Sequence, residues 1–314
     1  MSFLISGTGS ALPERIVTND DLSSIVDTND EWIVTRTGIK TRHICTTERV
    51  VDLCETAAKK AVENAGIKMS DIDLIICSTL NGEFITPSLG CAVAERLGIS
   101  PAAFDINGAC SGFVYALDLA DMYLQRDGFN NILVIAGEVM SKHLNWTDRS
   151  TCILFGDGAG AAVVCRGDAL KYMKIGAKCD FDILNIQSGM KKNPFSKEIP
   201  RGYVKMDGKE VYRFAVNAVK EELSGAKAAT GIEKFDFYVL HQANLRIIDA
   251  VKNRVGADEN FPVNIDKCGN MSSASIPVLL DEMVRDGRIQ KGTRLFISAF
   301  GAGLTTATAV IIWE

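Results

Sequence analysis

The sequence predicts an α/β fold that is built from two similar halves. Two observations carry this prediction: strand-like and helix-like segments alternate along the chain, and the same order of segments occurs twice. The chain has 314 residues, of which 47% are hydrophobic and 23% are charged. This composition is typical of a globular protein with a large core. We expect the halves, 1–168 and 169–314, to pack together with the functional site between them.

The first half starts with an apolar segment at 1–7 that lacks the basic start and the long apolar stretch of a signal peptide. Apolar residues of 51–65 recur at helical spacing, and Gly66 marks the end of that helix. The continuous apolar run at 73–77 is typical of a buried strand. The predicted order is a strand at 1–7, helices from Thr18 and at 30–37, 51–65 and 88–97, a strand at 73–77, an extended segment at 104–106, a helix after Cys110, and strands at 131–137 and 161–164.

The second half repeats this order. Its predicted elements are a helix at 211–227, a strand at 235–240, a helix from Ala243, an extended segment at 261–265, a helix from Ser272, and strands at 295–299 and 306–312. Glycine-rich segments at 155–160 and 300–303 precede the last strand of each half, and we expect both to be loops. Neither shows the G-x-G-x-x-G spacing before a helix, so a dinucleotide site is not indicated.

A cysteine follows turn residues in the middle of the first half. Asn107, Gly108 and Ser111 favour turns and helix caps, and apolar residues at helical spacing follow from Phe113. We therefore expect Cys110 in the first turn of a helix, where the partial positive charge of the terminus favours the thiolate. This placement makes Cys110 a candidate nucleophile. A small residue of the core is the alternative reading, because most buried cysteines are inert.

A nucleophilic cysteine needs a polar partner, and the chain has three histidines. His43 and His143 lie in polar segments, where a surface role is the simpler reading. His241 ends a buried strand, the position where ligands bind in open α/β sheets. Asn270 lies in a loop that the repeat places opposite the candidate nucleophile, and the same loop offers Cys268 as a rival thiol. A hydrogen-bonded core histidine and a plain helix cap are the alternatives for His241 and Asn270.

Charge and cysteine usage exclude several classes of protein. The net charge of −5 argues against a nucleic-acid-binding protein, and no apolar run is long enough to span a membrane. The nine cysteines contain no C-x-x-C pair, and the histidines show no metal-ligand spacing. We therefore expect reduced thiols, a cytoplasmic protein and no metal site.

Trp32 and Arg36 lie four residues apart in the predicted helix at 30–37 and share one face. One reading is an ordinary surface stacking pair, because cation–π contacts of this kind are common. The other reading is a platform for a flat heteroaromatic ring such as adenine.

Taken together, these segments resemble the β-ketoacyl-[acyl-carrier-protein] synthase III family of the thiolase superfamily. The resemblance runs from Gly7 to the final strand, and its motifs lie at 30–39, 109–113, 155–161, 241–246 and 269–272. It implies the five-layered α-β-α-β-α thiolase fold, a homodimer and no tightly bound cofactor. It also implies the first condensation of type II fatty-acid synthesis. In that reaction a short acyl-CoA acylates the cysteine, and the acyl group condenses with malonyl on acyl carrier protein.

The resemblance also implies roles for individual residues. Cys110 is the implied nucleophile, with His241 and Asn270 as its catalytic partners. The backbone N–H of Cys110 and one from the loop of Ala302 and Gly303 form the implied oxyanion hole. The implied CoA contacts are Thr28, Trp32, Arg36, Arg149 and Asn244. The implied carrier-protein contacts are Gln242, Ala243, Asn244, Leu245, Arg246, Arg213, Lys252 and Arg254, whose cations would steer an acidic carrier.

Departures from the family pattern bear on the choice of primer. Thr86 stands where some relatives place a bulky aromatic residue that enters the acyl pocket of the partner subunit, so we expect room for more than acetyl. Lys209 stands near the CoA channel, where asparagine is common. A condensing enzyme of secondary metabolism stays as the alternative function. From other classes, a Cys-His-Asn hydrolase and a binding module without catalysis are the rivals.

Overall fold

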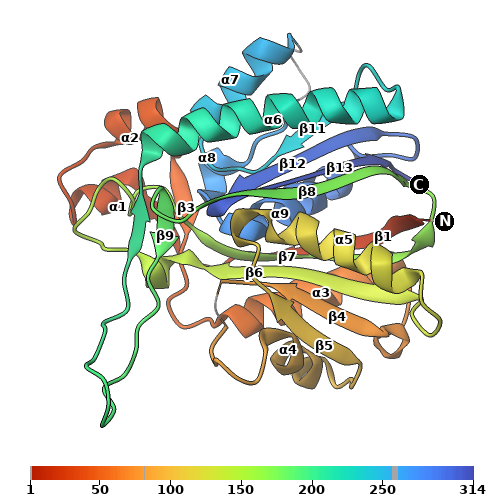
Figure 1. Ribbon diagram of the computed structural model, residues 1–314, viewed down its shortest axis with the longest axis horizontal. Helices are drawn as coiled ribbons and strands as arrows, with labels where there is room; N and C mark the ends of the chain where they lie inside the picture. Colours follow the sequence, from red (N-terminus) through yellow and green to blue (C-terminus); the bar gives the residue numbers. More distant parts are fainter. Residues whose placement is uncertain (1, 81, 257–260) are drawn as a thin grey trace.

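The computed structural model describes residues 2–80, 82–256 and 261–314. Two β-sheets lie face to face, with helices between them and on both outer sides (Figure 1). The layers follow the order α-β-α-β-α, which confirms the predicted five-layered fold.

The first sheet has five strands in the order β1-β7-β6-β4-β5. β4 pairs in parallel with β5 and β6, whereas β7 runs antiparallel to β6 and β1. The strands are β1 (Ser2–Ala11), β4 (Leu74–Ser78), β5 (Ala102–Ile106), β6 (Asn131–Val139) and β7 (Asp157–Gly167). β4 is buried along its whole length, as expected for a strand of a sheet that helices cover on both faces.

The second sheet has four strands in the order β11-β12-β13-β8. This is the order of the first sheet without an equivalent of β5. The strands are β8 (Leu170–Asp180), β11 (Phe237–Leu240), β12 (Arg294–Gly301) and β13 (Gly303–Ile312). The expectation of an extended strand-like segment at 261–265 is wrong, because the chain there leads into the short helix α8 (Ile265–Cys268). The Asn264 N–H donates to the Gln242 side chain instead of a neighbouring strand.

The duplication extends to single positions. Leu74 of β4 lies opposite Ile132 of β6, and Phe237 of β11 lies opposite Leu295 of β12. The same number of residues separates Leu74 from Phe237 and Ile132 from Leu295. We propose residue 168 as the boundary of the halves, because β7 ends just before it and β8 begins just after it.

Two helices, α5 (Gly112–Leu124) and α9 (Ser275–Arg285), form the layer between the sheets. One continuous cluster of buried side chains joins them to strands of both sheets, and it includes Phe113, Leu117 and Leu279. Both helices are apolar over much of their surface, as buried helices are. The turns that precede them carry Cys110 and Asn270.

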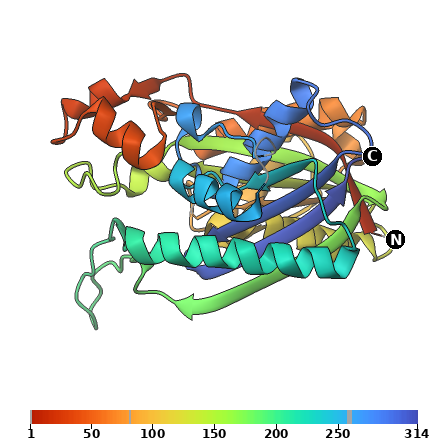
Figure 2. The ribbon, with the colours of Figure 1, turned by 90° about the horizontal axis from the view of Figure 1, so that it is seen from above.

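The outer layers consist of helices on the far face of each sheet (Figure 1), and Figure 2 looks down on the layer that covers the second sheet. α3 (Val50–Ala65) and α4 (Leu89–Leu97) cover the first sheet, and α6 (Gly208–Thr230) and α7 (Leu245–Val255) cover the second. At one end, a smaller apolar cluster joins short elements to the segment 140–155. These elements are β2 (Ile16–Thr18), α1 (Asn19–Ser23), α2 (Asp30–Thr37), β9 (Leu184–Ile186) and β10 (Val204–Met206). The short strand β3 (Thr41–His43) pairs with β2.

The expected loop at 155–160 is a strand over most of its length. β7 begins at Asp157, so Gly158 and Gly160 lie within the sheet. A side chain at Gly160 would come within 2.7 Å of Pro277 on α9, so this glycine lets the central layer approach the sheet closely. At 300–303 only Ala302 separates β12 from β13.

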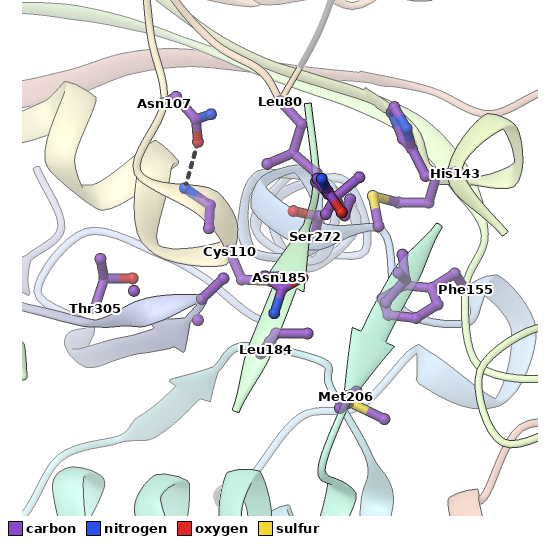
Figure 3. Close-up of a pocket in the computed structure, with 18 of the residues that line it drawn as sticks. Leu80, Asn107, Cys110, His143, Phe155, Leu184, Asn185, Met206, Ser272 and Thr305 are labelled. Carbon is purple, nitrogen blue, oxygen red and sulfur yellow. Dashed lines mark hydrogen bonds between the residues drawn. The ribbon is translucent and has the colours of Figure 1, made fainter. Parts of the chain in front are cut away.

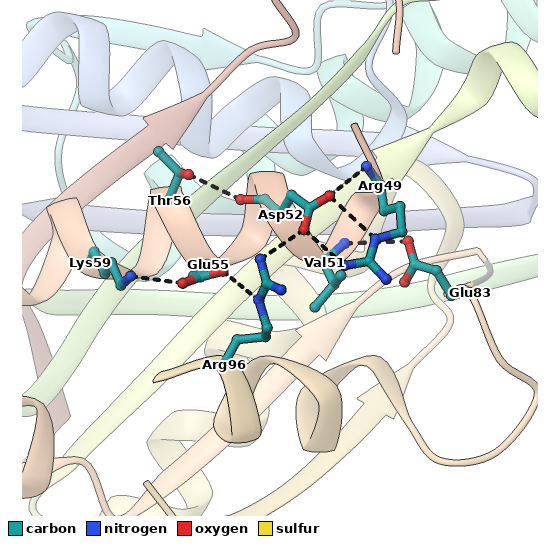
Figure 4. A network of polar contacts seen from close by, with 8 residues as sticks. All are labelled: Arg49, Val51, Asp52, Glu55, Thr56, Lys59, Glu83 and Arg96. Carbon is teal, nitrogen blue, oxygen red and sulfur yellow. Dashed lines mark hydrogen bonds and ion pairs between the residues drawn. The ribbon is translucent and has the colours of Figure 1, made fainter. Parts of the chain in front are cut away.

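A polar network ties α3 to α4 and to the loop before α4 (Figure 4). Arg96 of α4 forms ion pairs with Asp52 and Glu55 of α3, at 3.0 and 2.7 Å. The Val51 N–H donates to the Glu83 carboxylate at 3.4 Å. Exposed ion pairs contribute little to stability. The hydrogen bond from Val51 ties the loop of Glu83 to α3, and Glu83 lines the same cavity as Cys110.

Candidate active site

Cys110 lies in a short 3₁₀ turn, η2 (Ala109–Ser111), directly before α5. The expectation that it lies within the first turn of the helix is therefore wrong by two residues. Ala109 takes the left-handed conformation with φ 48°, and its N–H donates to the Asn107 side chain at 3.1 Å. A residue other than glycine rarely adopts this backbone conformation, so the surrounding structure must hold the turn in place.

A glycine of the second half packs against this turn. A side chain added at Gly301 would come within 2.8 Å of the Cys110 backbone nitrogen and 3.0 Å of its Cβ. The β12–β13 turn with Ala302 and Gly303 thus lies directly beside the candidate nucleophile, and all three residues of 301–303 line the same cavity.

The turn before α9 repeats the Cys110 turn. Ser272 has φ 50°, and its N–H donates to the Asn270 Oδ1 at 2.8 Å. Asn107 and Ala109 hold the equivalent places in the first half. Because the Asn270 Oδ1 accepts this bond, its amide N–H₂ is left to donate elsewhere. The Asn270 backbone is fixed as well, since its N–H donates to the Leu154 carbonyl at 2.9 Å.

His241 directly follows β11 and is 1% exposed. Its N–H donates to the Ser298 carbonyl at 2.9 Å, and its ring packs edge-on against Phe300 with centroids 5.4 Å apart. Within the described part of the chain, its buried Nδ1 has no hydrogen-bond partner. Burial lowers the pKa of His241 to about 3, so the imidazole is neutral at physiological pH. Its Nε2 is the ring nitrogen left to face the cavity.

Cys110, His241 and Asn270 line one cavity of 1810 Å³ that lies between the two halves. Figure 3 shows Cys110 and Ser272 facing a chamber with an apolar wall. That wall includes Leu80, Met140, Phe155, Leu184 and Met206. The structure therefore brings the three predicted polar residues to one site. The rival thiol, Cys268, is buried outside this cavity.

The Cys110 thiol does not have the lowered pKa expected from a helix terminus. Burial raises its pKa to about 12, and the nearby Ser272 hydroxyl and the Cys110 N–H oppose this rise. A buried thiol among apolar groups resists ionisation because the charged form loses its hydration. Reaction therefore requires that the thiolate form beside these donors as the substrate arrives.

Trp32 contacts two arginines near the surface. The guanidinium carbon of Arg36 is 4.3 Å from the centre of its ring, and that of Arg149 is 5.0 Å away. Arg149 also donates to the Asp27 carbonyl at 2.8 Å. The Thr28 hydroxyl is buried without a hydrogen-bond partner among the described residues. This group can stack on a flat ring and bind phosphate.

Helix α7 connects the Trp32 surface to the cavity. Asn244 caps this helix, and its side-chain amide donates to the Arg36 carbonyl at 3.1 Å. Asn244 and Arg246 also line the cavity, together with Ala243. Leu245 packs on Gly38 at the end of α2, where a side chain would clash with it.

The expected carrier-protein contacts divide into surface and interior residues. Arg246, Arg213 and Arg254 are exposed, and Lys252 is half-buried. Arg213 forms an ion pair with Glu210 at 3.3 Å, and Arg254 donates to Asn217. The expectation fails for the Gln242 side chain, which is 0% exposed and donates to the Leu240 carbonyl at 2.7 Å.

Two polar residues of the site escaped the sequence prediction. His143 is 5% exposed and lines the cavity, with its Nδ1 3.3 Å from Arg201, so a surface role for it is wrong. Glu138 is 2% exposed at the end of β6, beneath the Asn270 turn. A signal for Glu138 was present, because it is the single charged residue in the otherwise apolar run from Ile132 to Met140.

The chain also matches known proteins over its whole length. The model of 3-oxoacyl-[acyl-carrier-protein (ACP)] synthase III matches residues 104–180, and that of its C-terminal part matches 226–313. The chain is 45% identical to β-ketoacyl-[acyl-carrier-protein] synthase III of Desulfitobacterium hafniense (strain Y51), over 99% of this chain and 97% of that relative. The chain belongs to the β-ketoacyl-[acyl-carrier-protein] synthase III family. The predicted family and enzyme class are confirmed, and the family's enzymes are acyltransferases that carry out a condensation.

Solved structures of similar proteins have the same fold. The crystal structure of the synthase III from Aquifex aeolicus VF5 has a TM-score of 0.92 and 38% sequence identity, covering 99% of this chain and 100% of that one. The priming β-ketosynthase of the R1128 polyketide pathway also has a TM-score of 0.92, with 35% identity, covering 100% and 96%.

Two classes of feature are missing from the described residues. No helix there combines the length and the apolar character needed to cross a membrane. In the same part of the chain, no group of three or more His, Cys, Asp or Glu side chains is arranged to hold a metal ion.

The low pKa of His241 predicts how stability depends on pH. The unfolded chain binds a proton at His241 below its usual pKa of 6.5, whereas the native chain does so only below about 3. Stability is therefore lost as pH falls through 6.5. Between pH 7.5 and 5.0 this site should account for about 2 kcal/mol of lost stability.

Urea unfolding of the wild type and of His241→Asn at both pH values measures this contribution. The variant should lose less stability on acidification than the wild type, by roughly that 2 kcal/mol. Equal losses in the two proteins would mean that His241 titrates normally in the native state.

Proposed function

We propose that this chain catalyses the decarboxylative condensation of an acyl-CoA with malonyl-[acyl-carrier-protein], the initiating step of fatty-acid synthesis, through an acyl-Cys110 intermediate. The observation that carries the proposal is the meeting of Cys110, His241 and Asn270 in one cavity between the halves. A thiol provides the acyl acceptor, and two neutral hydrogen-bond donors suit an enolate oxygen.

In the first half-reaction, the Cys110 sulfur attacks the thioester carbonyl of acyl-CoA. The bond between the carbonyl carbon and the CoA sulfur breaks, and CoA leaves as the thiol with the proton from Cys110. The Cys110 N–H and an N–H of the turn at 301–303 are the proposed oxyanion donors. The close approach of Gly301 to Cys110 supports this pairing, because no side chain separates the two backbones.

In the second half-reaction, the malonyl thioester loses CO₂ and becomes an enolate. We assign its oxygen to the His241 Nε2–H and the Asn270 amide. Both side chains are nearly buried, so few water molecules compete with these hydrogen bonds. The enolate carbon then attacks the acyl carbon on Cys110, the bond from that carbon to the Cys110 sulfur breaks, and the 3-oxoacyl product forms on the carrier. Cys110 leaves as a thiolate and takes up one proton from solvent.

The substrate carriers approach from the surface of α2 and α7. Trp32 with Arg36 and Arg149 offers stacking and charge for the adenine and phosphates of CoA, with Thr28 and Asn244 beside them. Arg246, Arg213, Lys252 and Arg254 would attract an acidic carrier protein to a chain with net charge −5. We keep Ala243 and Leu245 as carrier contacts. Gln242 instead positions the turn from the interior.

Assembly and location are further parts of the proposal. We propose a homodimer in which Thr86, an exposed residue outside this chain's own cavity, enters the acyl pocket of the second subunit. We also propose a cytoplasmic location, with acyl-CoA as a substrate and no tightly bound cofactor. The free state of all nine cysteines supports that location.

Intact-protein mass spectrometry tests both the reaction and the choice of primer. Incubation with a panel of acyl-CoAs of increasing length should add one acyl group per chain, and malonyl-carrier should remove it with release of CO₂. Thr86 leads us to expect adducts with four- and five-carbon primers as well as acetyl. An acetyl adduct alone would contradict the wider pocket, and no adduct with any primer would contradict the proposed function.

A further inference from the structure

A buried carboxylate lies beneath the turn that carries Asn270. Glu138 is 2% exposed, and its Oε1 accepts a hydrogen bond from the Ser273 hydroxyl at 2.7 Å. Its Oε2 accepts one from the Leu80 N–H at 3.1 Å. Glu138 belongs to the first half and Ser273 to the second, so the carboxylate joins the halves at the site.

The duplication shows what this contact corresponds to. The interval that separates Asn107 from Asn270 also separates Cys110 from Ser273 and Glu138 from Gly301. The contact between Glu138 and Ser273 is thus the counterpart of the close approach of Gly301 to Cys110. At the first contact, the glycine at 301 leaves room for Cys110. At the equivalent contact, the Glu138 carboxylate and the Ser273 hydroxyl fill the corresponding space.

The Ser272 hydroxyl lies between this carboxylate and the nucleophile. It has no hydrogen-bond partner of normal geometry among the described residues, yet it is near enough to lower the pKa of both the Cys110 thiol and the Glu138 carboxyl. Burial outweighs these bonds and raises the pKa of Glu138 to about 7. The titratable groups that its charge reaches are the thiols of Cys110 and Cys54, and the charge raises the pKa of each.

We propose that Glu138 is a positioning residue of this site: it holds the turn of Asn270 against the turn of Cys110, and its negative charge opposes the Cys110 thiolate in the free enzyme. This inference rests on the proposed function for its kinetic part. Its electrostatic part does not require any substrate, because it concerns the thiol alone.

The first test is the pH dependence of Cys110 alkylation by iodoacetamide in wild type and Glu138→Gln. Intact mass with Cys110→Ser as background separates this thiol from the exposed Cys91 and Cys179. The variant lacks the charge, so its Cys110 should react about three- to ten-fold faster at pH 8.5. A purely structural role for Glu138 would not shift this profile. An unchanged profile would overturn the electrostatic part of the proposal.

The second test measures CO₂ release from malonyl-carrier by the acylated enzyme. Glu138→Gln offers one acceptor oxygen instead of two, so it cannot accept from the Ser273 hydroxyl and the Leu80 N–H at the same time. Release should fall about ten-fold while acylation of Cys110 persists. The Ser273→Ala variant loses only the hydroxyl, and its rate of CO₂ release should be several-fold below that of the wild type. This variant tests the positioning role even if the Glu138→Gln protein is unfolded. Undiminished release by Ser273→Ala would overturn the positioning role.

Glu222 provides the matched control. It is also a buried glutamate, 4% exposed, and it accepts hydrogen bonds from the Ser298 and Thr308 hydroxyls on the second sheet. Glu222→Gln should leave the alkylation profile of Cys110 unchanged. If the wild-type chain accepts no acyl group, the proposed function is wrong. The alkylation experiment would still test the electrostatic effect of Glu138 on Cys110, because it needs no substrate.

Discussion

Replacing Cys110 by serine should reduce acyl transfer from acyl-CoA by at least about a thousand-fold. Among the described residues that line the cavity, Cys110 carries the only thiol, and it lies against the turn of Gly301. A hydroxyl at this position is harder to ionise than a thiol, and neither histidine of the described cavity is a strong base, because burial lowers the pKa of His241 to about 3 and that of His143 to about 4. Intact mass after incubation with acyl-CoA measures the transfer.

Cys268→Ser is the control for this substitution. Cys268 is also buried, burial raises its pKa to about 12, and it lies outside the cavity of Cys110. This variant should be acylated at the wild-type rate. Acylation of the Cys110→Ser variant at an undiminished rate would show that another residue accepts the acyl group.

Replacing either His241 or Asn270 by alanine should separate the two half-reactions. Each variant should retain acylation of Cys110, because the thiol and the backbone donors of its turn are unchanged. Each should lose malonyl decarboxylation by about 100- to 1000-fold, the usual effect of removing one donor to a developing oxyanion. Acyl adduct and CO₂ release, measured on the same preparation, give the two rates.

His143→Ala tests whether any polar side chain of the cavity has this effect. His143 lines the same cavity and is nearly as buried as His241, but it is engaged by Arg201. Its loss should change decarboxylation by no more than a few-fold. The division of roles would be refuted if His241→Ala and Asn270→Ala lost acylation and decarboxylation in equal measure.

Element order was predictable from the sequence because it depends on local patterns. The alanine stripe of α3, the apolar run of β4 and the glycines that end α2 and α3 each act within a few residues. Strand pairing at 261–265 was not predictable in this way. Whether a short apolar segment joins a sheet depends on the partners offered, and here Gln242 satisfies the Asn264 N–H from its side chain.

The candidate site could be predicted where the residue type and its position in the repeated order both indicate a chemical role. Cys110, His241 and Asn270 stand out because each follows a strand or a turn in a repeated order. The raised pKa of the Cys110 thiol could not be predicted, because the sequence indicates a helix terminus but not how deeply the thiol is buried. Glu138 belongs to this second kind, since its importance comes from the chain segment that folds over it.

The matched turns of Asn107 and Asn270 have a consequence for the geometry of bond formation. One backbone shape is used twice in the site, and residues of both copies line the cavity. In the proposed reaction the electrophilic carbon rests at one copy and the carbanion at the other. The new carbon–carbon bond would therefore form midway between two copies of a single ancestral loop. Neither half could have carried out such a joining reaction alone, because each copy holds only one of the two carbons.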